Sequence, residues 1–300
     1  MNIIMYHYVR PDNPEYPYFN HLNIDKFRRQ LDYFDKQYGF LKKEEFFEAI
    51  DKNKSPDGVV LTFDDGFKDH YQYVLPELVN RGLWGLFYVS THVYQSSKLL
   101  GVHRTHYLKG KYGAKQILKD TLELVEDHML DHETISEFDT EIYTFSGYDT
   151  EEKKLRRMFN YYISYEYRDG ILDKLMEKYF DEQELHKQVY LSLDEMCDIK
   201  NAGSVIGSHT VHHKVLSRLS YQDQASEIQN SFEFLNSNVG LDQYCFCYPY
   251  GYKSSYNSDT LDILIKLHVH NAVVFDNRVQ LGDLQRYELS RQDCNLFMEV

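Results

Sequence analysis

The sequence predicts an α/β fold, because short apolar segments of strand length alternate with helical segments along most of the chain. Residues 59–63 (VVLTF) are β-branched and aromatic, as expected of a buried strand. A helical segment and a second apolar run at 84–90 (WGLFYVS) follow, and strand–helix–strand at this spacing forms a βαβ unit, which needs a parallel sheet. The alternation stops near residue 95 and resumes near residue 190, which indicates an insertion.

The remaining elements follow the same alternation. We expect strands at 2–6, 59–63, 84–90, 204–207 and 271–275, at the beginning of 245–251, and in the tail at 284–299, which also holds a short helix. We expect helices at 24–37, 43–52, 192–202, 220–238 and 257–267, and one that follows the second strand and ends near Gly82. One α/β domain over residues 1–300 fits this order better than two tethered domains, because no Pro- or Ser-rich linker separates the parts.

The insertion covers residues of about 95–190 and is rich in Lys, Glu, Asp and Tyr. Its weak helical periodicity predicts several helices, which would form a cap or lid or, equally, a partner-binding face. Tyr161, Tyr162 and Tyr165 would suit the stacking of a sugar, but their helical spacing favours a place in a helix core.

The composition excludes some classes of function. The formal net charge of −14 argues against nucleic acid and an anionic membrane surface as partners, since both are bound through basic patches. No apolar run reaches the roughly 18 residues of a membrane span, and the N-terminal MNIIMYHYVRPDN does not have the pattern of a secretory signal. We expect all four cysteines to be reduced and the protein to be cytoplasmic, although a processed chain without its leader would look the same.

Two adjacent carboxylates follow the predicted strand at 59–63. Asp64 and Asp65 precede Gly66, which lets the chain turn sharply and approach a ligand. In α/β folds, functional sites collect at the carboxyl ends of the strands. Adjacent like charges repel, so a metal bound by one Asp would leave the other available as a base. A solvated Asp-Asp-Gly turn is the alternative interpretation of this segment.

A histidine cluster follows the predicted strand at 204–207. His209 and His213 are four residues apart, and on one helical turn their Cβ atoms would lie about 6 Å apart on the same face, within reach of one ion. His212 would point elsewhere, and taken alone the three histidines suit an ordinary surface equally well. Two imidazoles and one carboxylate are a ligand set of catalytic zinc with an open position for water. Such a metal would activate the water and polarise a carbonyl, while the spare Asp takes the proton.

Three motifs stand in order along the chain: TFDDG at 62–66, HTVHH at 209–213 and YPYG at 248–251. In this order they resemble the polysaccharide deacetylases with a NodB-type domain, carbohydrate esterase family four. MYHYV at 5–9 and RYELSRQD at 286–293 also look similar to family segments, so the resemblance covers most of the chain apart from the insertion. It implies a distorted (β/α) barrel of NodB type with a helical insertion and with the site at the C-terminal ends of the strands.

The resemblance also implies roles for individual residues. Asp64 would be the general base. The metal ligands would be Asp65, His209 and His213. The main-chain N–H in the turn of Tyr250 would stabilise the oxyanion, and Arg291 would orient the base.

Two positions depart from the family pattern. Cys247 stands where many relatives carry an Arg, although a subset of the family reads similarly to FCYPYG. The late Leu-x-His segment, whose histidine protonates the leaving amine in relatives, has no counterpart after Arg291. The general acid is therefore unassigned, and the candidates for an acid or a substrate contact are His7, His103 and His106.

The combined pattern predicts a metal-dependent deacetylase that hydrolyses an N-acetyl or other acyl group on a sugar of a cell-surface polysaccharide or its precursor. We expect one divalent ion, zinc by its ligand set, although cobalt, nickel or iron would bind similar ligands. The expected substrate is a lipid-linked, nucleotide-linked or oligosaccharide acyl sugar, because a cytoplasmic location disfavours finished extracellular polymers. The alternatives are a non-catalytic, metal-containing sugar-binding protein of the same fold and a different metallohydrolase, such as a phosphoesterase with a second metal.

Overall fold

The computed structural model describes residues 1–132, 150–279 and 284–299, and it divides into two compact units. The first unit contains Met1–Pro11, His21–Gln95 and Val189–Val300, and the second contains Asp12–Asn20 and Ser96–Gln188. The second unit therefore takes in a short N-terminal segment as well as most of the expected insertion. Whether the units together form one domain over residues 1–300, with an insertion at about 95–190, stays a prediction.

The first unit is a closed barrel of parallel strands, so the predicted α/β barrel is confirmed. Neighbouring strands around the barrel pair in register, and the last strand pairs with the first to close it. Within the described residues the order around the barrel is β1 (Asn2–Tyr6), β4 (Val59–Phe63), β5 (Gly85–Val89), β6 (Val205–Ser208), β7 (Cys245–Cys247), β8 (Asn271–Phe275) and β9 (Leu289–Asp293).

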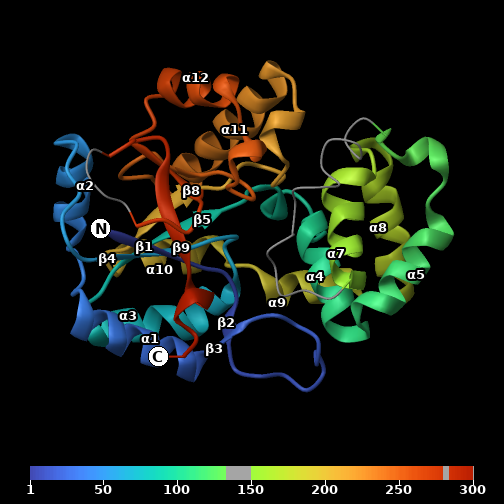
Figure 1. Cartoon of the computed structure of the whole chain (residues 1–300), viewed down its shortest axis with the longest axis horizontal. Helices are drawn as coiled ribbons and strands as arrows, with labels where there is room; N and C mark the ends of the chain where they lie inside the picture. The colour runs from blue at the N-terminus through green and yellow to red at the C-terminus, as the bar shows by residue number, and fades with distance from the viewer. Residues whose placement is uncertain (133–149, 280–283, 300) are drawn as a thin grey trace. The chain divides into compact units, whose positions relative to one another are not determined.

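Helices cover the outside of the barrel. In Figure 1, α1 and α3 lie on one side of the strands and α11 and α12 on the other. These helices and the smaller elements of the unit are α1 (Ile24–Gln37), α2 (Lys43–Asp51), the π-helical turn η1 (His70–Val74), α3 (Leu75–Arg81), α10 (Leu193–Asn201), α11 (Tyr221–Val239) and α12 (Ser258–Lys266), the short strands β2 (Val9–Arg10) and β3 (Leu22–Asn23), and the 3₁₀ turns η2 (His92–Tyr94), η5 (Leu216–Arg218), η6 (Lys253–Ser255) and η7 (Cys294–Phe297).

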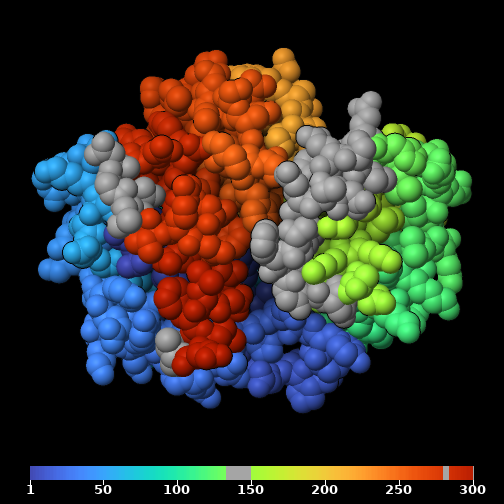
Figure 2. All heavy atoms as spheres, in the orientation of Figure 1, coloured from blue at the N-terminus to red at the C-terminus, as the bar shows by residue number. Residues whose placement is uncertain are grey.

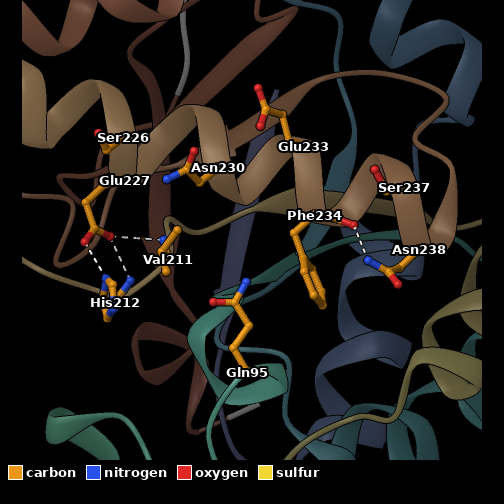
Figure 3. A pocket seen from close by; sticks show the side chains of 10 residues that line it. All are labelled: Gln95, Val211, His212, Ser226, Glu227, Asn230, Glu233, Phe234, Ser237 and Asn238. Carbon is orange, nitrogen blue, oxygen red and sulfur yellow. Dashed lines mark hydrogen bonds and ion pairs between the residues drawn. The ribbon is translucent and has the colours of Figure 1, made fainter.

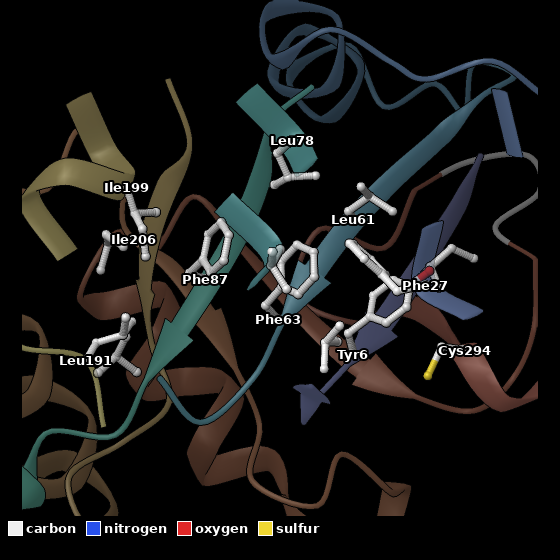
Figure 4. Packing of buried hydrophobic residues seen from close by; sticks show 14 of the residues in the cluster. Tyr6, Phe27, Leu61, Phe63, Leu78, Phe87, Leu191, Ile199, Ile206 and Cys294 are labelled. Carbon is white, nitrogen blue, oxygen red and sulfur yellow. The ribbon is translucent and has the colours of Figure 1, made fainter. Parts of the chain in front are cut away.

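The outer surface of the barrel packs against these helices through aromatic side chains. Phe63 of β4 stacks on Phe87 of β5 with ring centroids 4.6 Å apart, and Tyr6 of β1 lies 5.3 Å from Phe63 (Figure 4). Phe27 of α1 closes this cluster edge-on against Tyr6 at 5.1 Å. The inside of the barrel is filled by a separate apolar cluster that includes Ile3, Val60, Leu86, Val205, Val273 and Leu289. The inside of the barrel is therefore closely packed with apolar side chains.

The two ends of the chain meet at the closing pair of strands. Ile4 of β1 pairs with Gln292 of β9, and the ring of Phe297 lies 4.9 Å from that of Phe34 in α1. Figure 2 shows the side chains of this C-terminal segment, in red, beside the blue side chains of the N-terminal region. The final strand thus depends on the first one for its place, which matters for the site because β9 carries Arg291.

The second unit is helical. Its helices are α4 (Gly101–Tyr112), α5 (Ala114–Leu124), α7 (Thr150–Arg157), α8 (Tyr165–Tyr179) and most of α9 (Glu182–Val189), with the turns η3 (Asp127–Met129) and η4 (Met158–Tyr162). Of the three tyrosines expected in the helix core, Tyr161 is 2% exposed, in agreement with that place, whereas Tyr162 and Tyr165 are half-buried. Residues 133–149 of the expected insertion lie outside the described residues. No helix in the described part of the chain is long and apolar enough to cross a membrane.

Candidate metal centre and catalytic site

The barrel brings most of the predicted site residues to the carboxyl ends of its strands. Main-chain hydrogen bonds continue the strand ladders into the site, because Asp64 N donates to Tyr6 O (2.9 Å) and His209 N donates to Val89 O (3.0 Å). The residues placed in this way are His7 after β1, Asp64 and Asp65 after β4, His209 and His213 after β6, Tyr250 after β7, and Arg291 within β9.

Asp64 is held by a buried arginine. Arg291 donates from Nη1 to Oδ1 (2.7 Å) and from Nη2 to Oδ2 (2.8 Å), and both side chains are 2% exposed or less. Burial by itself raises the pKa of Asp64, but the charge of Arg291, assisted by His209 and His7, outweighs it and leaves this pKa below its ordinary value. Asp64 is therefore an ionised carboxylate whose plane is fixed by a bidentate contact.

The other donors of Arg291 are also satisfied. Nη1 donates to Thr62 Oγ1 (3.1 Å), Nη2 to Cys247 Sγ (3.1 Å) and Nε to Val274 O (3.4 Å), so each of the five N–H groups has an acceptor. Cys247 Sγ also lies 3.5 Å from Asp64 Oδ2. The small side chain at position 247 leaves room for the guanidinium that arrives from β9, so the departure from the family pattern there is compatible with a held Asp64.

Asp65, His209 and His213 converge on one point. Asp65 Oδ1 lies 3.6 Å from His209 Nε2 and 3.6 Å from His213 Nε2, and all three residues are buried. Two atoms that bind zinc at about 2.0–2.2 Å with a tetrahedral angle between them lie about 3.3–3.6 Å apart. Both distances from Asp65 match this spacing, so Asp65, His209 and His213 are suited to hold one divalent ion, which would activate a water molecule there.

The main chain sets the ring of His209 for metal binding. Its Nδ1 lies 2.8 Å from Cys247 O, and because a carbonyl only accepts, Nδ1 carries the proton and Nε2 presents its lone pair toward Asp65. Burial lowers the pKa of His209, and the charges of Asp64 and Asp65 offset this only in part. The ring is therefore neutral near pH 7, as a metal ligand must be.

The expectation that His209 and His213 lie on a helical turn is wrong. Residues 209–213 form a loop, in which Thr210 and His213 have φ angles of 65° and 54°. The loop folds back so that the two rings lie 4.7 Å apart, and His213 N donates to Thr210 Oγ1 (3.0 Å). Asp65 and Tyr250 also have positive φ, and a side chain other than glycine in that region costs about 1–3 kcal/mol. Four of the seven such residues in the described part of the chain thus lie at this site.

His7 is the acid candidate that the barrel places at the site. Its Nε2 lies 3.9 Å from Asp64 Oδ2, and the side chain is 40% exposed. His70 Nε2 donates to His7 O (2.8 Å) and so holds the main chain at this position. His103 and His106 lie in α4 of the second unit, with rings 6.1 Å apart, and their part in the reaction stays a prediction.

Sequence reasoning missed several contacts at the site. Thr62, within TFDDG itself, accepts from Arg291, and a signal for it existed because it lies on the same strand face as Asp64. Glu227 of α11 accepts hydrogen bonds from the histidine loop. A glutamate within a long helix normally faces solvent, so nothing in the sequence distinguished this one.

One protein-family model matches the part of the chain that contains two of the three motifs. The model of the polysaccharide deacetylase family matches residues 171–272, a span that contains HTVHH and YPYG. Over this span the chain is similar to the polysaccharide deacetylases. A search of curated protein sequences gives no significant match.

Several solved structures share the fold over nearly the whole chain. The Streptococcus pyogenes deacetylase PplD, in complex with acetate, superposes with a TM-score of 0.60 at 20% identity, covering 98% of this chain and 91% of that one. IcaB from Ammonifex degensii gives 0.53 at 16% identity, covering 97% and 90%, and the BpsB deacetylase domain from Bordetella bronchiseptica gives 0.56 at 10% identity, covering 97% and 94%. The predicted NodB-type barrel is confirmed by this likeness.

Proposed function

We propose that this chain is a metal-dependent deacetylase that hydrolyses an N-acetyl group, or another acyl group, on a sugar. The observation that carries the proposal is the 3.6 Å spacing of Asp65 from the imidazoles of His209 and His213, beside the ionised and fixed Asp64. Two imidazoles and one carboxylate with an open position are a ligand set of hydrolytic zinc. The neighbouring free carboxylate supplies the base that hydrolysis requires.

Each residue of the site has a proposed role in hydrolysis. A divalent ion held by Asp65, His209 and His213 would lower the pKa of a bound water and polarise the acyl oxygen. Asp64, ionised at neutral pH, accepts the proton of the attacking water. Zinc is the first choice, and cobalt, nickel and iron suit the same ligands.

The developing charge and the leaving group need two further contacts. The main-chain N–H in the turn of Tyr250 would donate to the acyl oxygen as it becomes negative, and the side chain of Tyr250 lies 5.0 Å from His213, ring to ring. His7 would give a proton to the leaving amine, since it lies near Asp64 and its ring is partly open to solvent.

The two alternative functions differ in how well the site supports them. Among the described residues, the one other cluster of potential metal ligands is Asp64, His209 and Cys247. This cluster shares His209 with the first one. Asp64 already forms an ion pair with Arg291, so a second cation bound there would lie beside a buried positive charge. A two-metal phosphoesterase is therefore disfavoured. A non-catalytic sugar-binding protein remains the alternative, because the late histidine of the family has no counterpart here.

The proposed substrate is a lipid-linked, nucleotide-linked or oligosaccharide precursor of a cell-surface polysaccharide. The family match and the fold shared with solved deacetylases support an acetylated saccharide as the class of substrate. The choice of a precursor over a finished polymer depends on a cytoplasmic location, which stays a prediction.

Metal content and acetate release test the proposal. The purified chain would be stripped with a chelator, reloaded with zinc or cobalt, and assayed on N-acetylglucosamine oligosaccharides and on nucleotide-linked and lipid-linked N-acetyl sugars. We expect one ion per chain and acetate release that chelation abolishes and metal restores, with ion and activity lost together in His209→Ala. Bound metal without acetate from any of these sugars would favour the sugar-binding alternative, and more than one ion per chain would favour the phosphoesterase.

A further inference from the structure

The loop that carries both histidine ligands has every main-chain donor engaged. Three of its five N–H groups bond to β5 or to hydroxyls nearby in the sequence: His209 to Val89 O, Thr210 to Ser208 Oγ (3.3 Å) and His213 to Thr210 Oγ1. The two that remain belong to Val211 and His212, and both point to one side chain from a different element, Glu227 of α11.

Glu227 makes three short contacts with this loop (Figure 3). Oε2 accepts from Val211 N (3.1 Å) and His212 N (2.7 Å), and Oε1 accepts from His212 Nδ1 (2.6 Å). The residue is 6% exposed. Burial raises the pKa of Glu227, but the hydrogen bonds from the ring and main chain of His212 outweigh it and leave this pKa below its ordinary value. The contacts are therefore charge-assisted hydrogen bonds to a carboxylate, which are the strong ones.

The loop needs such an external anchor because its own backbone is strained. Thr210 and His213 stand on either side of the Val211–His212 peptide, and both have positive φ. The opposite edge of the loop is held from η2 and its cap, where Thr91 N donates to Thr210 O (3.1 Å) and His92 N to Val211 O (3.0 Å). Glu227 completes the other edge, and without it the buried N–H group of Val211 and the half-buried N–H group of His212 would lose their acceptors.

We propose that Glu227 is a positioning residue of the metal centre, which fixes the Val211–His212 turn and thereby sets the spacing of the His209 and His213 imidazoles. The inference deepens the proposed function and rests on it. Glu227 acts through the main chain of the loop. It lies in a groove of about 520 Å³ that is also lined by Asn230, Glu233 and Phe234 and not by the metal ligands. A substitution at Glu227 therefore removes a contact that holds the histidine loop and leaves the metal ligands themselves unchanged.

Zinc affinity of the apoprotein, measured by competition with a chromogenic chelator, tests this role. Glu227→Ala should weaken zinc binding about 10- to 100-fold, the usual effect of removing a residue that orients metal ligands. Glu227→Gln should fall between Glu227→Ala and the wild type, because the amide keeps one acceptor oxygen and loses the charge. Glu233→Ala is the matched control, since Glu233 is an exposed glutamate of the same helix and the same groove, and it should bind zinc as the wild type does.

Thermal unfolding of the apoproteins separates positioning from a merely structural role. A structural role would lower the apo Tm of Glu227→Ala and leave its zinc affinity at the wild-type value, and that result would overturn the inference. If Glu227→Ala does not fold, unchanged affinity in Glu227→Gln overturns it equally. A wild-type chain that binds no zinc would contradict the proposed function itself, so the two failures are distinguishable.

Discussion

The two compact units both bury charged side chains, but they give them different partners. In the helical unit Arg104 is 3% exposed, and its Nε and Nη2 lie 2.6 Å and 3.0 Å from the two carboxylate oxygens of Glu182. Lys109, also 3% exposed, lies 2.5 Å from Glu152. In the barrel unit Asp64 has a similar ion pair with Arg291, whereas its neighbour Asp65 faces two imidazoles.

The difference lies in the chemistry of the partner and not in burial. A guanidinium or an ammonium neutralises a buried carboxylate but has no lone pair for a cation. An imidazole with its other nitrogen bonded, as in His209, does present a lone pair, so a carboxylate beside two imidazoles has the composition of a metal centre. The buried ion pairs of the helical unit should therefore affect stability alone, whereas the Asp64–Arg291 pair of the barrel unit should affect catalysis.

The largest expected effect is that of removing the base. Asp64→Asn should lower kcat by about 10²- to 10⁴-fold, because the amide cannot take a proton, while Asp65, His209 and His213 keep the ion. Asp120→Asn in the helical unit is the matched change, since Asp120 is 5% exposed and bonded to Lys178 (2.6 Å), and it should leave kcat unchanged. Steady-state acetate release with metal analysis measures both, and wild-type turnover in Asp64→Asn would remove Asp64 from the base role.

The general acid is the next comparison between the units. His7→Gln should lower kcat about 10²-fold on an N-acetyl sugar, the lower end of what acid catalysis contributes, with zinc content unchanged. His103→Gln and His106→Gln, both in the helical unit, should retain most of the activity. A larger loss in either of these than in His7→Gln would transfer the acid role to the helical unit.

The bidentate contact between Arg291 and Asp64 should have a smaller effect on kcat. Arg291→Lys keeps the charge but loses the bidentate contact with Asp64, so kcat should fall about 10- to 100-fold with KM little changed. Arg104→Lys makes the same exchange in the helical unit and should lower the Tm without changing kcat. Equal kinetic effects of the two exchanges would mean that the contrast between the units is wrong.

The smallest expected effect concerns stability and pH. Burial lowers the pKa of His70 from 6.5 to about 4, so the folded protein keeps this ring neutral when the unfolded chain takes up a proton. The stability that results is present above pH 6.5 and is lost as the pH falls toward 4. Between pH 7 and pH 5 the wild type should lose about 2 kcal/mol more of its unfolding free energy than His70→Gln does, as measured by urea denaturation. If the unfolding free energy of the two proteins changed equally with pH, the assignment of this pH dependence to His70 would be contradicted.

Much of the barrel could be predicted from local pattern. The strand at Val59–Phe63 and the helix at Ile24–Gln37 fall where the apolar runs and helical periodicity placed them, because a buried parallel strand is apolar throughout and a surface helix repeats its apolar face. The helix that ends at Gly82 stops there because Gly82 adopts φ 65°. Whether the helices of the insertion belong to one domain with the barrel was not determined by these patterns.

The prediction for the histidine segment failed for a physical reason. A spacing of four residues suits a helical turn, but the segment leaves the carboxyl end of β6, where the main-chain N–H groups of Thr91 and His92 donate to its carbonyls and Glu227 accepts from its N–H groups. These contacts come from distant parts of the chain, and they stabilise a loop with positive φ at Thr210 and His213 against the local preference.

By itself, the sequence determined the alternation of strands and helices and the residue types able to bind a metal and a proton, since both are properties of neighbouring residues. Tertiary structure alone decided how those residues are used: that Arg291 reaches Asp64 while Asp65 meets two imidazoles, and that Glu227 supports their loop. The reason is that β9 closes on β1 and α11 packs beside β6, so side chains far apart in the sequence become neighbours only when the barrel is complete.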